Sequence, residues 1–342
     1  MFVGGERHFG KDGKMKISVI LCTYNRCQSL ANALGSVAAS TLPNWVEWEV
    51  LVVDNNSCDQ TRAVVGEFCQ RYPGRFRYLF EPRPGKSNAL NTGIRAARGD
   101  ILVFTDDDVT VEPMWLQNLT AALHNREWAG MGGRTLPERN FSRPRWLSLE
   151  ERTLAMLGIF DRGPEAFELT EPLLGNNMAY QKEMFEKHGG FRTDLGPLPD
   201  CQFQNEDTEF GLRLLAAGER LRYEPSAVVY HSVPASRIQK DYFLSWWFDK
   251  ARADVRAFGF ELQTKWYLAG IPLVLFRRLA MWTLRWIFTM ESCGRFSNQV
   301  KVWYVAGQIL ECYNQALSKR RQRRHLLVDD PAISGPQGPK RS

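Results

Sequence analysis

Three consecutive carboxylates, Asp106, Asp107 and Asp108, follow the apolar run at 100–104 (DILVF) and Thr105. Adjacent carboxylates repel one another, and a divalent cation is the simplest way to neutralise them. Oxygen ligands from one or two Asp side chains suit Mg²⁺ or Mn²⁺, which keeps coordination positions for phosphate oxygens and water. The cluster therefore predicts a metal site. A solvated acidic turn, or the acidic start of a helix, is the alternative interpretation.

Several other kinds of catalytic site are excluded by their motifs. Residues 84–87 (PGKS) resemble the end of a P-loop, but the first glycine of that motif would fall at Phe80. The segment 130–132 (GMG) lacks the third glycine of a dinucleotide fingerprint, because that position is Thr135. No H-E-x-x-H or G-x-S-x-G sequence occurs. These absences argue against P-loop enzymes, nicotinamide dehydrogenases, zinc proteases and serine hydrolases.

The elements that must position the carboxylates alternate between strands and helices in the first hundred residues. Short apolar runs with polar ends predict buried strands, and apolar residues at helical spacing lie between them. Such βαβ alternation predicts a mostly parallel sheet covered on both faces, with ligands at the carboxyl ends of the strands. The predicted strands are 16–22, 49–53, 75–80 and 100–104, and the predicted helices are 28–39, 61–71 and 86–98.

The remaining sequence predicts further elements and an irregular cover. Residues 135–172 are rich in Arg, Pro and Glu with weak periodicity, which predicts an irregular or partly helical segment over the site. From Ala235 onward the pattern is helical throughout, and the polar tail 329–342 is predicted to be disordered. The other predicted elements are helices at 112–125 and 205–218 and strands at 128–134, 173–180 and 222–231.

Length and charge set broader limits. A chain of 342 residues exceeds the roughly 250–300 at which one hydrophobic core stops growing, so about two structural units are expected. The net charge is +6, but residues 265–342 carry +9 and residues 1–264 carry −3. This asymmetry favours a C-terminal region that meets an anionic surface, either phospholipid headgroups or RNA. Seven cysteines without a C-x-x-C pair, and no apolar signal segment, predict a reducing, cytoplasmic location.

Five sequence blocks, in one order, closely resemble glycosyltransferase family 2. They are 17–26 (ISVILCTYNR), 50–61 (VLVVDNNSCDQT), 84–109 (PGKSNALNTGIRAARGDILVFTDDDV), 175–191 (GNNMAYQKEMFEKHGGF) and 205–218 (NEDTEFGLRLLAAG). The resemblance covers about residues 16–231. It implies a GT-A fold, which is a Rossmann-like, mostly parallel sheet flanked by helices. It also implies inverting transfer of a sugar from a nucleotide-diphosphate donor to an acceptor hydroxyl.

The resemblance assigns a donor site to the ends of the predicted strands. Asp54 corresponds to the family carboxylate that contacts the nucleoside, although capping of the turn 55–57 is an alternative role. Lys86 and Asn88 correspond to basic and amide groups near the donor, with polar helix-start roles as the alternative. The implied donor-binding residues are Thr23, Tyr24, Asn25, Arg26, Asp54, Lys86, Asn88, Asp106 and Asp107.

The acidic cluster matches the DxD element of the family, with Asp106 facing the ribose and Asp108 the metal. A bound Mg²⁺ or Mn²⁺ stabilises the negative charge that develops on the leaving diphosphate. The implied metal ligands are Asp106, Asp108 and His231. For His231, a hydrogen-bonded structural histidine at a strand end is the alternative.

The family pattern places the catalytic base at Asp207, with Glu206 beside it to raise its proton affinity or orient the acceptor. Glu206 is the alternative base, and simple enrichment of acids in the first helical turn is the structural alternative. Gly175, Asn176 and Asn177 are expected near the transferred sugar, or else in a buried strand start.

The C-terminal region predicts a membrane contact. Residues 266–290 are strongly apolar, but the longest uncharged run, 266–276, is too short for the about 20 residues of a membrane-spanning helix. Arg277, Arg278 and Arg285 fall near one helix face, with Trp282 and Trp286 near its boundary, which is typical of a helix lying in a membrane interface. The basic cluster 319–324 would add attraction to an anionic leaflet. Packing on the catalytic domain or on a second subunit is the alternative.

Together these patterns predict a cytoplasmic enzyme, peripheral on the membrane, in cell-surface polysaccharide or glycolipid synthesis. The expected partners are a nucleotide-sugar donor, first of all a UDP-sugar, a glycan or lipid-linked acceptor and an anionic membrane surface, without nucleic acid. A sugar-1-phosphate nucleotidyltransferase and a catalytically idle glycan-binding scaffold are the alternatives. The predicted ranges are an N-terminal extension at 1–15, a GT-A domain at 16–234, a helical region at 235–325 and a disordered tail at 326–342.

Overall fold

The computed structural model describes residues 14–124, 126–138, 144–147, 156–199, 201, 203–260 and 265–328. Most of the predicted N-terminal extension, two parts of the predicted cover and the tail from residue 329 lie outside the described residues.

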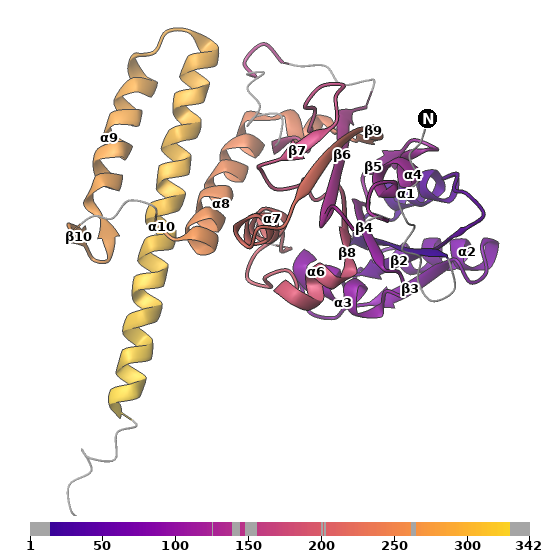
Figure 1. Ribbon diagram of the computed structural model, residues 1–342. Helices are drawn as coiled ribbons and strands as arrows, with labels where there is room; N and C mark the ends of the chain where they lie inside the picture. Colours follow the sequence, from indigo (N-terminus) through magenta and orange to yellow (C-terminus); the bar gives the residue numbers. More distant parts are fainter. Residues whose placement is uncertain are drawn as a thin grey trace, which may run out of the picture.

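The body of the protein is a nine-stranded sheet with helices on both faces (Figure 1). Its main path runs β3-β2-β1-β4-β8-β6-β9-β5, and β7 pairs with β9 off this path. Strands β1, β2, β3, β4, β6 and β9 point the same way, so the predicted mostly parallel α/β sheet is confirmed. The strands are β1 Met15–Thr23, β2 Val46–Asp54, β3 Phe76–Phe80, β4 Ile101–Asp106, β5 Val109–Val111, β6 Gly130–Pro137, β7 Phe167–Leu169, β8 Asn177–Gln181 and β9 Leu221–His231.

Alternation along the buried strands divides the core into two layers. Val19 and Leu21 of β1 face one layer, which also contains apolar residues of α1, α2 and α4. Ile20 of β1 faces the other layer, with residues of α3, α6 and α7. Burial on both faces explains why the strands read as continuous apolar runs. The helices are α1 Cys27–Ala38, α2 Thr61–Arg71, α3 Lys86–Ala96, α4 Trp115–Thr120, α6 Lys182–His188 and α7 Glu206–Ala216.

Strand register brings the polar strand ends to one rim. Thr23 pairs with Asp54 across β1 and β2, and Cys22 pairs with Asp106 across β1 and β4. The antiparallel strand β8 begins at this rim, because Asn177 pairs with Thr105. Strand β9 runs parallel to β6 and ends at His231, on the same side. The rim therefore gathers polar residues from both halves of the sequence.

The C-terminal region consists of helices beside the sheet body (Figure 1). Helix α8 (Lys240–Phe258) follows the short 3₁₀ helix η1 (Ala235–Ile238), and α9 (Leu273–Phe288) and α10 (Ser292–Val328) follow α8. Apolar residues of α9 and α10, including Leu275 and Val305, share a small core with Val255 of α8. Within the described part of the chain, no helix is both long and apolar enough to cross a membrane.

Apolar packing also joins the predicted cover to these helices. Leu147, Met156 and Leu157 of the cover form one buried cluster with Phe243 of α8 and Phe296 of α10. The ring of Trp146 lies edge-on to both phenylalanines, with centroids 5.3 and 4.8 Å away. The described part of the cover is therefore supported by the C-terminal helices.

The sequence pattern predicted that the region from 235 onward is helical throughout, and this prediction is wrong at one place. A two-stranded hairpin, β10 (Tyr267–Leu268) and β11 (Ile271–Pro272), precedes α9. Ala269 and Gly270 form its turn, both with positive φ (52° and 89°), which is typical of tight hairpins.

Two other predicted elements differ in extent. The helix expected at 112–125 is reduced to α4, because the backbone N–H of Glu112 still bonds to Val228 next to the β5–β9 pairing. Helix α10 continues to Val328, beyond the predicted start of a disordered tail at 326, since Leu326 and Leu327 are good helix formers.

Candidate active site

A cavity of about 770 Å³ opens above the rim of strand ends. Its walls come from β1, β4, the residues just before β8, the start of α7, the end of β9 and helix α8. Twelve of the residues predicted from the sequence line it: Thr23, Tyr24, Arg26, Lys86, Asp106, Asp107, Asp108, Gly175, Asn176, Glu206, Asp207 and His231.

Asp107 is the buried member of the acidic cluster. Its carboxylate accepts hydrogen bonds from Thr23 Oγ1 at 2.7 Å and Arg26 Nη1 at 3.0 Å. Burial raises the pKa of Asp107 to about 6, although the nearby Arg26 charge works in the opposite direction. Asp107 thus fixes the guanidinium of Arg26 over the rim.

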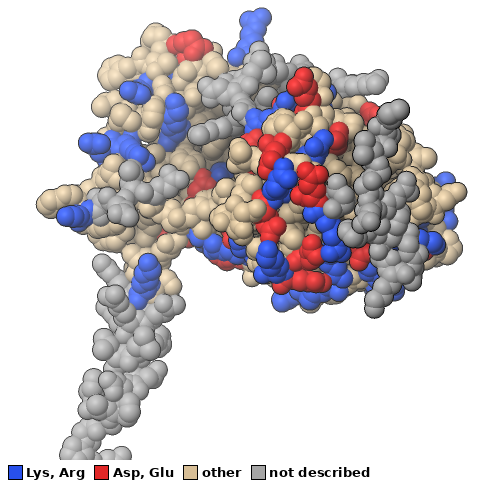
Figure 2. All heavy atoms as spheres, viewed as in Figure 1, with Lys and Arg blue, Asp and Glu red and all other residues tan. Residues whose placement is uncertain are grey.

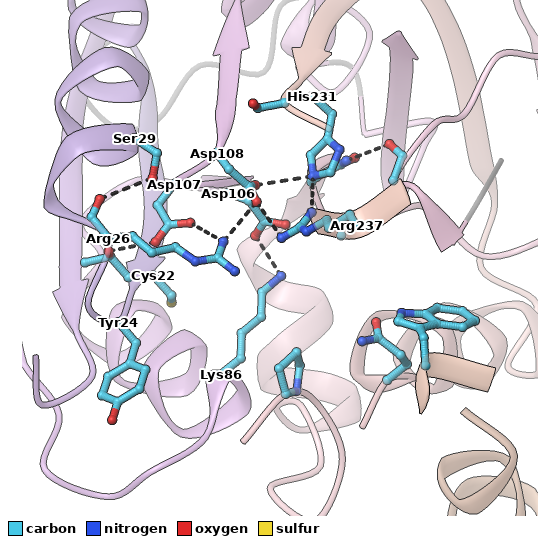
Figure 3. Close-up of a pocket in the computed structure, with 18 of the residues that line it drawn as sticks. Cys22, Tyr24, Arg26, Ser29, Lys86, Asp106, Asp107, Asp108, His231 and Arg237 are labelled. Carbon is cyan, nitrogen blue, oxygen red and sulfur yellow. Dashed lines mark hydrogen bonds and ion pairs between the residues drawn. The ribbon is translucent and has the colours of Figure 1, made fainter. Parts of the chain in front are cut away.

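Asp108 lies between three basic side chains (Figure 3). Arg26 and Arg237 each place a guanidinium nitrogen 2.9 Å from Asp108 Oδ2, and His231 Nε2 lies 3.3 Å from Oδ1. Burial alone would raise the pKa of Asp108, but the bond and charge of His231 and both arginines hold it well below its usual range. Asp108 is therefore a carboxylate in this structure.

Lys86 connects the acidic cluster to the start of α7. Its Nζ lies 2.7 Å from Asp106 Oδ1 and 3.7 Å from Glu206 Oε1. Burial works to lower the pKa of Lys86, but the charges of Asp106 and Glu206 outweigh it, so the net shift is upward. Figure 3 shows this side chain reaching toward Asp106 from the start of α3. The lysine therefore carries a positive charge between two acidic groups.

The predicted acid pair opens α7. Glu206 is 4% exposed, and burial together with the charge of Asp207 raises its pKa to about 7. Asp207 Oδ2 accepts the backbone N–H of Gly175 at 2.7 Å, and its Oδ1 accepts that of Thr208 at 2.6 Å. Gly175 precedes β8, so this bond joins the α7 start to the rim.

The side chains of the cavity can be tested as ligands for a divalent cation. Among the described residues, no three His, Cys, Asp or Glu side chains are grouped as a ready metal site. The described lining residues nevertheless include five carboxylates against three Lys or Arg side chains, a formal excess of two negative charges. Asp106 and Asp108 offer the oxygen ligands that Mg²⁺ and Mn²⁺ prefer. The residues fit such an ion once Arg26 and Arg237 release Asp108.

Four predicted residues do not line the cavity in the described structure. Asp54 accepts hydrogen bonds from Ser57 N–H at 2.8 Å and from Tyr78 Oη at 2.8 Å. The bond from Ser57 is the turn-capping role that the sequence allowed as the alternative for Asp54. The others also have local structural contacts: Asn25 Oδ1 accepts the N–H of Cys58, Asn88 Nδ2 donates to the Pro84 carbonyl, and the Asn177 amide contacts Trp115, Arg134 and Ala227.

Several cavity residues were missed by the sequence reasoning. Arg237 comes from η1, and Tyr242 and Trp246 come from α8, in a region interpreted only as helical. The available signal for Arg237 was a basic residue a few positions after the strand end at His231. Tyr242 and Trp246 carry no local signal, because only the packing of α8 beside the sheet brings them to the cavity.

Comparisons with known proteins agree with this architecture. The structure superimposes on the Pyrobaculum calidifontis mannosyltransferase PcManGT, solved with GDP-Man and Mn²⁺, with a TM-score of 0.55 and 19% identity over 93% of this chain and 82% of that one. The fold is the GT-A fold of nucleotide-sugar glycosyltransferases. Residues 18–189 match the family model described as glycosyl transferase family 2. The chain therefore belongs to glycosyltransferase family 2 and is a glycosyltransferase.

Two curated relatives extend the comparison. The Haloferax volcanii glucosyl-dolichyl phosphate glucuronosyltransferase is 27% identical over 240 residues, which cover 68% of this chain and 75% of the relative. The succinoglycan biosynthesis protein ExoM of Rhizobium meliloti is also 27% identical, over 65% of this chain and 69% of its own length. Both names belong to the synthesis of glycolipids or polysaccharides.

Proposed function

We propose that this protein transfers a sugar, with inversion, from a nucleotide-diphosphate donor to an acceptor hydroxyl, assisted by Mg²⁺ or Mn²⁺. The observation that carries the proposal is the bridge made by Lys86, which contacts both Asp106 and Glu206. Donor-side carboxylates and the acid pair at 206–207 thus share one cavity. A sugar held between them has a leaving group on one side and a base on the other.

Each side chain has a chemical task in this reaction. Asp207 accepts the proton of the attacking hydroxyl, and the Gly175 N–H keeps its carboxylate oriented. Lys86, Arg26 and Arg237 donate hydrogen bonds to the departing diphosphate, where negative charge increases in the transition state. When bound by Asp106, Asp108 and His231, a divalent cation supplies further neutralisation of that leaving group.

We propose a UDP-sugar as the first donor to test. PcManGT was solved with GDP-Man and Mn²⁺, and a second structural neighbour, GalNAc-T7, with UDP, GalNAc and Mn²⁺ (TM-score 0.51, 17% identity, 72% of this chain and 51% of that one). Both guanine and uracil nucleotide sugars should therefore be tested. A ligand that binds only the folded state stabilises it with the logarithm of its excess over Kd, so thermal shifts with UDP-, GDP- and dTDP-sugars rank the donors.

Transfer is then assayed with the best donor, with and without EDTA. Turnover that is lost with EDTA and restored by Mn²⁺ is the expected result. Unchanged turnover after chelation contradicts the metal role. No thermal shift with any nucleotide sugar contradicts the donor class.

We propose a glycan or lipid-linked acceptor, in cell-surface polysaccharide or glycolipid synthesis, at the cytoplasmic face of a membrane. The names of the two curated relatives support this acceptor class. All seven cysteines are free, which suits a reducing compartment.

The outward face of α9 supports an anionic membrane surface as the partner. Leu284 and Ile287 are each 55% exposed and Phe288 is 75% exposed. Arg277 and Arg285 are also exposed on this helix, and residues 265–290 contain no acidic residue. Figure 2 shows several basic side chains among uncharged atoms on this side of the molecule, with an acidic group at its top, whereas charges of both signs are dense on the sheet body. An interfacial helix buries such apolar residues and contributes about 1 kcal/mol for each basic residue near anionic lipid.

The exposed face of α9 differs from the one expected from the sequence, which placed Trp282 at the edge of the membrane-facing side. Trp282 is turned toward α10, where Lys301 Nζ lies 4.4 Å from its ring centroid. The residues offered to lipid are therefore the aliphatic and phenylalanine side chains of the outward face. A second copy of the chain is a poorer occupant, because it would bring arginines together without acidic partners.

Vesicle cosedimentation tests this surface. The full chain is expected to bind vesicles that contain phosphatidylglycerol, and to bind pure phosphatidylcholine much more weakly. The double variant Leu284→Asp/Ile287→Asp should lose binding, while Met114→Asp, a 43% exposed residue of the sheet body, should keep it. Equal binding by both variants, or self-association through this face without vesicle binding, overturns the membrane proposal.

A further inference from the structure

The loop that leads into α7 is anchored on the C-terminal helix α8. Asn205, which is 1% exposed, donates from Nδ2 to Asp254 Oδ1 at 2.7 Å. Two residues earlier, Phe203 is 2% exposed, and the guanidinium carbons of Arg252 and Arg256 lie 4.7 and 4.2 Å from its ring centroid. Both contacts join the residues just before the catalytic acid pair to the same helix.

Asp254 is a junction between three parts of the molecule. Its Oδ2 accepts the hydroxyl of Tyr304, on α10, at 2.6 Å. Its Oδ1 is shared by Asn205 and by Lys250, one turn earlier on α8. Helix α8 is joined to α10 again where Arg256 Nε lies 2.6 Å from the buried Glu311. The anchor of the loop is therefore fixed on two packed helices.

The start of α7 needs such an anchor because its own capping is unusual. Asn205 is the N-cap residue, but it makes no side-chain capping bond to the helix. Its backbone is left-handed, with φ of 83°, a conformation that persists in a non-glycine residue when surrounding contacts impose it. Glu206 and Asp207 follow directly, so a change at Asn205 moves both carboxylates.

We infer that Asp254 is a positioning residue that holds Asp207 in its catalytic orientation through Asn205. The inference rests on the proposed role of Asp207 as the base. Asp254 itself is not among the described residues of the cavity wall, and the donor contacts of Lys86, Asp106 and Arg26 do not involve it. Its loss should therefore lower turnover while leaving donor binding intact.

The experiment compares Asp254→Ala with the wild type in transfer kinetics and in hydrogen exchange of residues 206–210. Because small displacements of a catalytic group cost one to two orders of magnitude, kcat should fall about 10- to 100-fold with the donor KM within about twofold. Exchange at 206–210 should become faster, since the first turn of α7 loses its anchor. Asp254→Asn keeps an acceptor for Asn205 and offers an N–H to Tyr304, so it should restore most of kcat.

Lys250→Ala is the matched control, because it removes a charge from the same carboxylate without touching Asn205. It should leave both kcat and the exchange at 206–210 close to wild type. Asn205→Gly keeps the left-handed backbone, removes the link and should reproduce Asp254→Ala, even if the alanine variant folds poorly. Wild-type kcat and exchange in Asp254→Ala and Asn205→Gly overturn the inference. A wild-type chain without any transfer contradicts the proposed function instead, and the exchange comparison still tests the anchor.

Discussion

Replacing Asp207 by Asn tests the proposed base and carries two separate costs. The amide cannot take a proton from the acceptor, and loss of a general base typically lowers kcat by about 10² to 10⁴, or about 3 to 5 kcal/mol of barrier. The second cost concerns stability. Both Asp207 oxygens accept backbone N–H groups, from Gly175 at 2.7 Å and from Thr208 at 2.6 Å. An asparagine has one acceptor oxygen, so one N–H loses its partner, at about 1–3 kcal/mol.

The assay measures transfer, donor-induced thermal shift and urea unfolding on the same preparations. Asp207→Asn should lose transfer and some stability but keep the shift given by the donor, because Lys86 and Asp106 are unchanged. Glu206→Gln is the comparison variant. Glu206 Oε2 is buried without a hydrogen-bond partner in the described structure, so replacing this oxygen by an amide nitrogen removes no hydrogen bond to a backbone N–H. Turnover by Asp207→Asn within about threefold of wild type refutes its assignment as the base.

Two further predictions concern charge in the cavity. Because burial and the charge of Asp207 raise the pKa of Glu206 from 4.5 to about 7, the folded protein holds a proton that the unfolded chain releases in this range. The resulting stability is present below pH 4.5 and is lost as pH rises to about 7, with a slope of up to about 1.4 kcal/mol per pH unit. Urea unfolding across that window should show a steeper loss of stability in wild type than in Glu206→Gln, which keeps the contribution of Asp107, and parallel profiles contradict it. Arg237→Ala frees one side of Asp108, so Mn²⁺ measured by calorimetry without donor should bind roughly three- to tenfold more tightly, as expected for a partly buried ion pair. Unchanged or weaker Mn²⁺ binding argues that Asp108 is not a ligand.

Much of the sheet and its rim could be predicted because the signals are local. Val19 to Leu21 and Val50 to Val53 are apolar runs that end in polar residues, and the register of parallel strands aligns those ends. Acidic residues at 106–108 and 206–207 carry enough chemistry in their types and spacing to be singled out. Their meeting in one cavity follows from topology once the alternation of strands and helices is recognised.

The remaining features depend on contacts between residues that are distant in the sequence. Nothing near Asp254 in the sequence indicates Asn205, which lies 49 residues earlier. Arg237 reaches Asp108 across 129 residues because β9 ends paired with β5, whose first residue, Val109, follows Asp108 directly. For Asp54 the sequence offered two partners, the nucleoside by family resemblance and the backbone of the turn 55–57. In the structure its carboxylate accepts the N–H of Ser57 in that turn. Local patterns give no means of ranking such competing contacts.

The shared packing of the cover and the C-terminal helices limits how these segments can be exchanged between related enzymes. Met156 lines the cavity and also packs in the cluster that contains Phe243 and Trp246 of α8. A chimaera that grafts only the segment around 144–160 sets foreign side chains against the resident helix and leaves mismatched volumes, which destabilise a close-packed interior. Grafting α8 together with that segment preserves their complementarity. The smallest exchangeable unit is thus a pair of segments that are distant in the sequence.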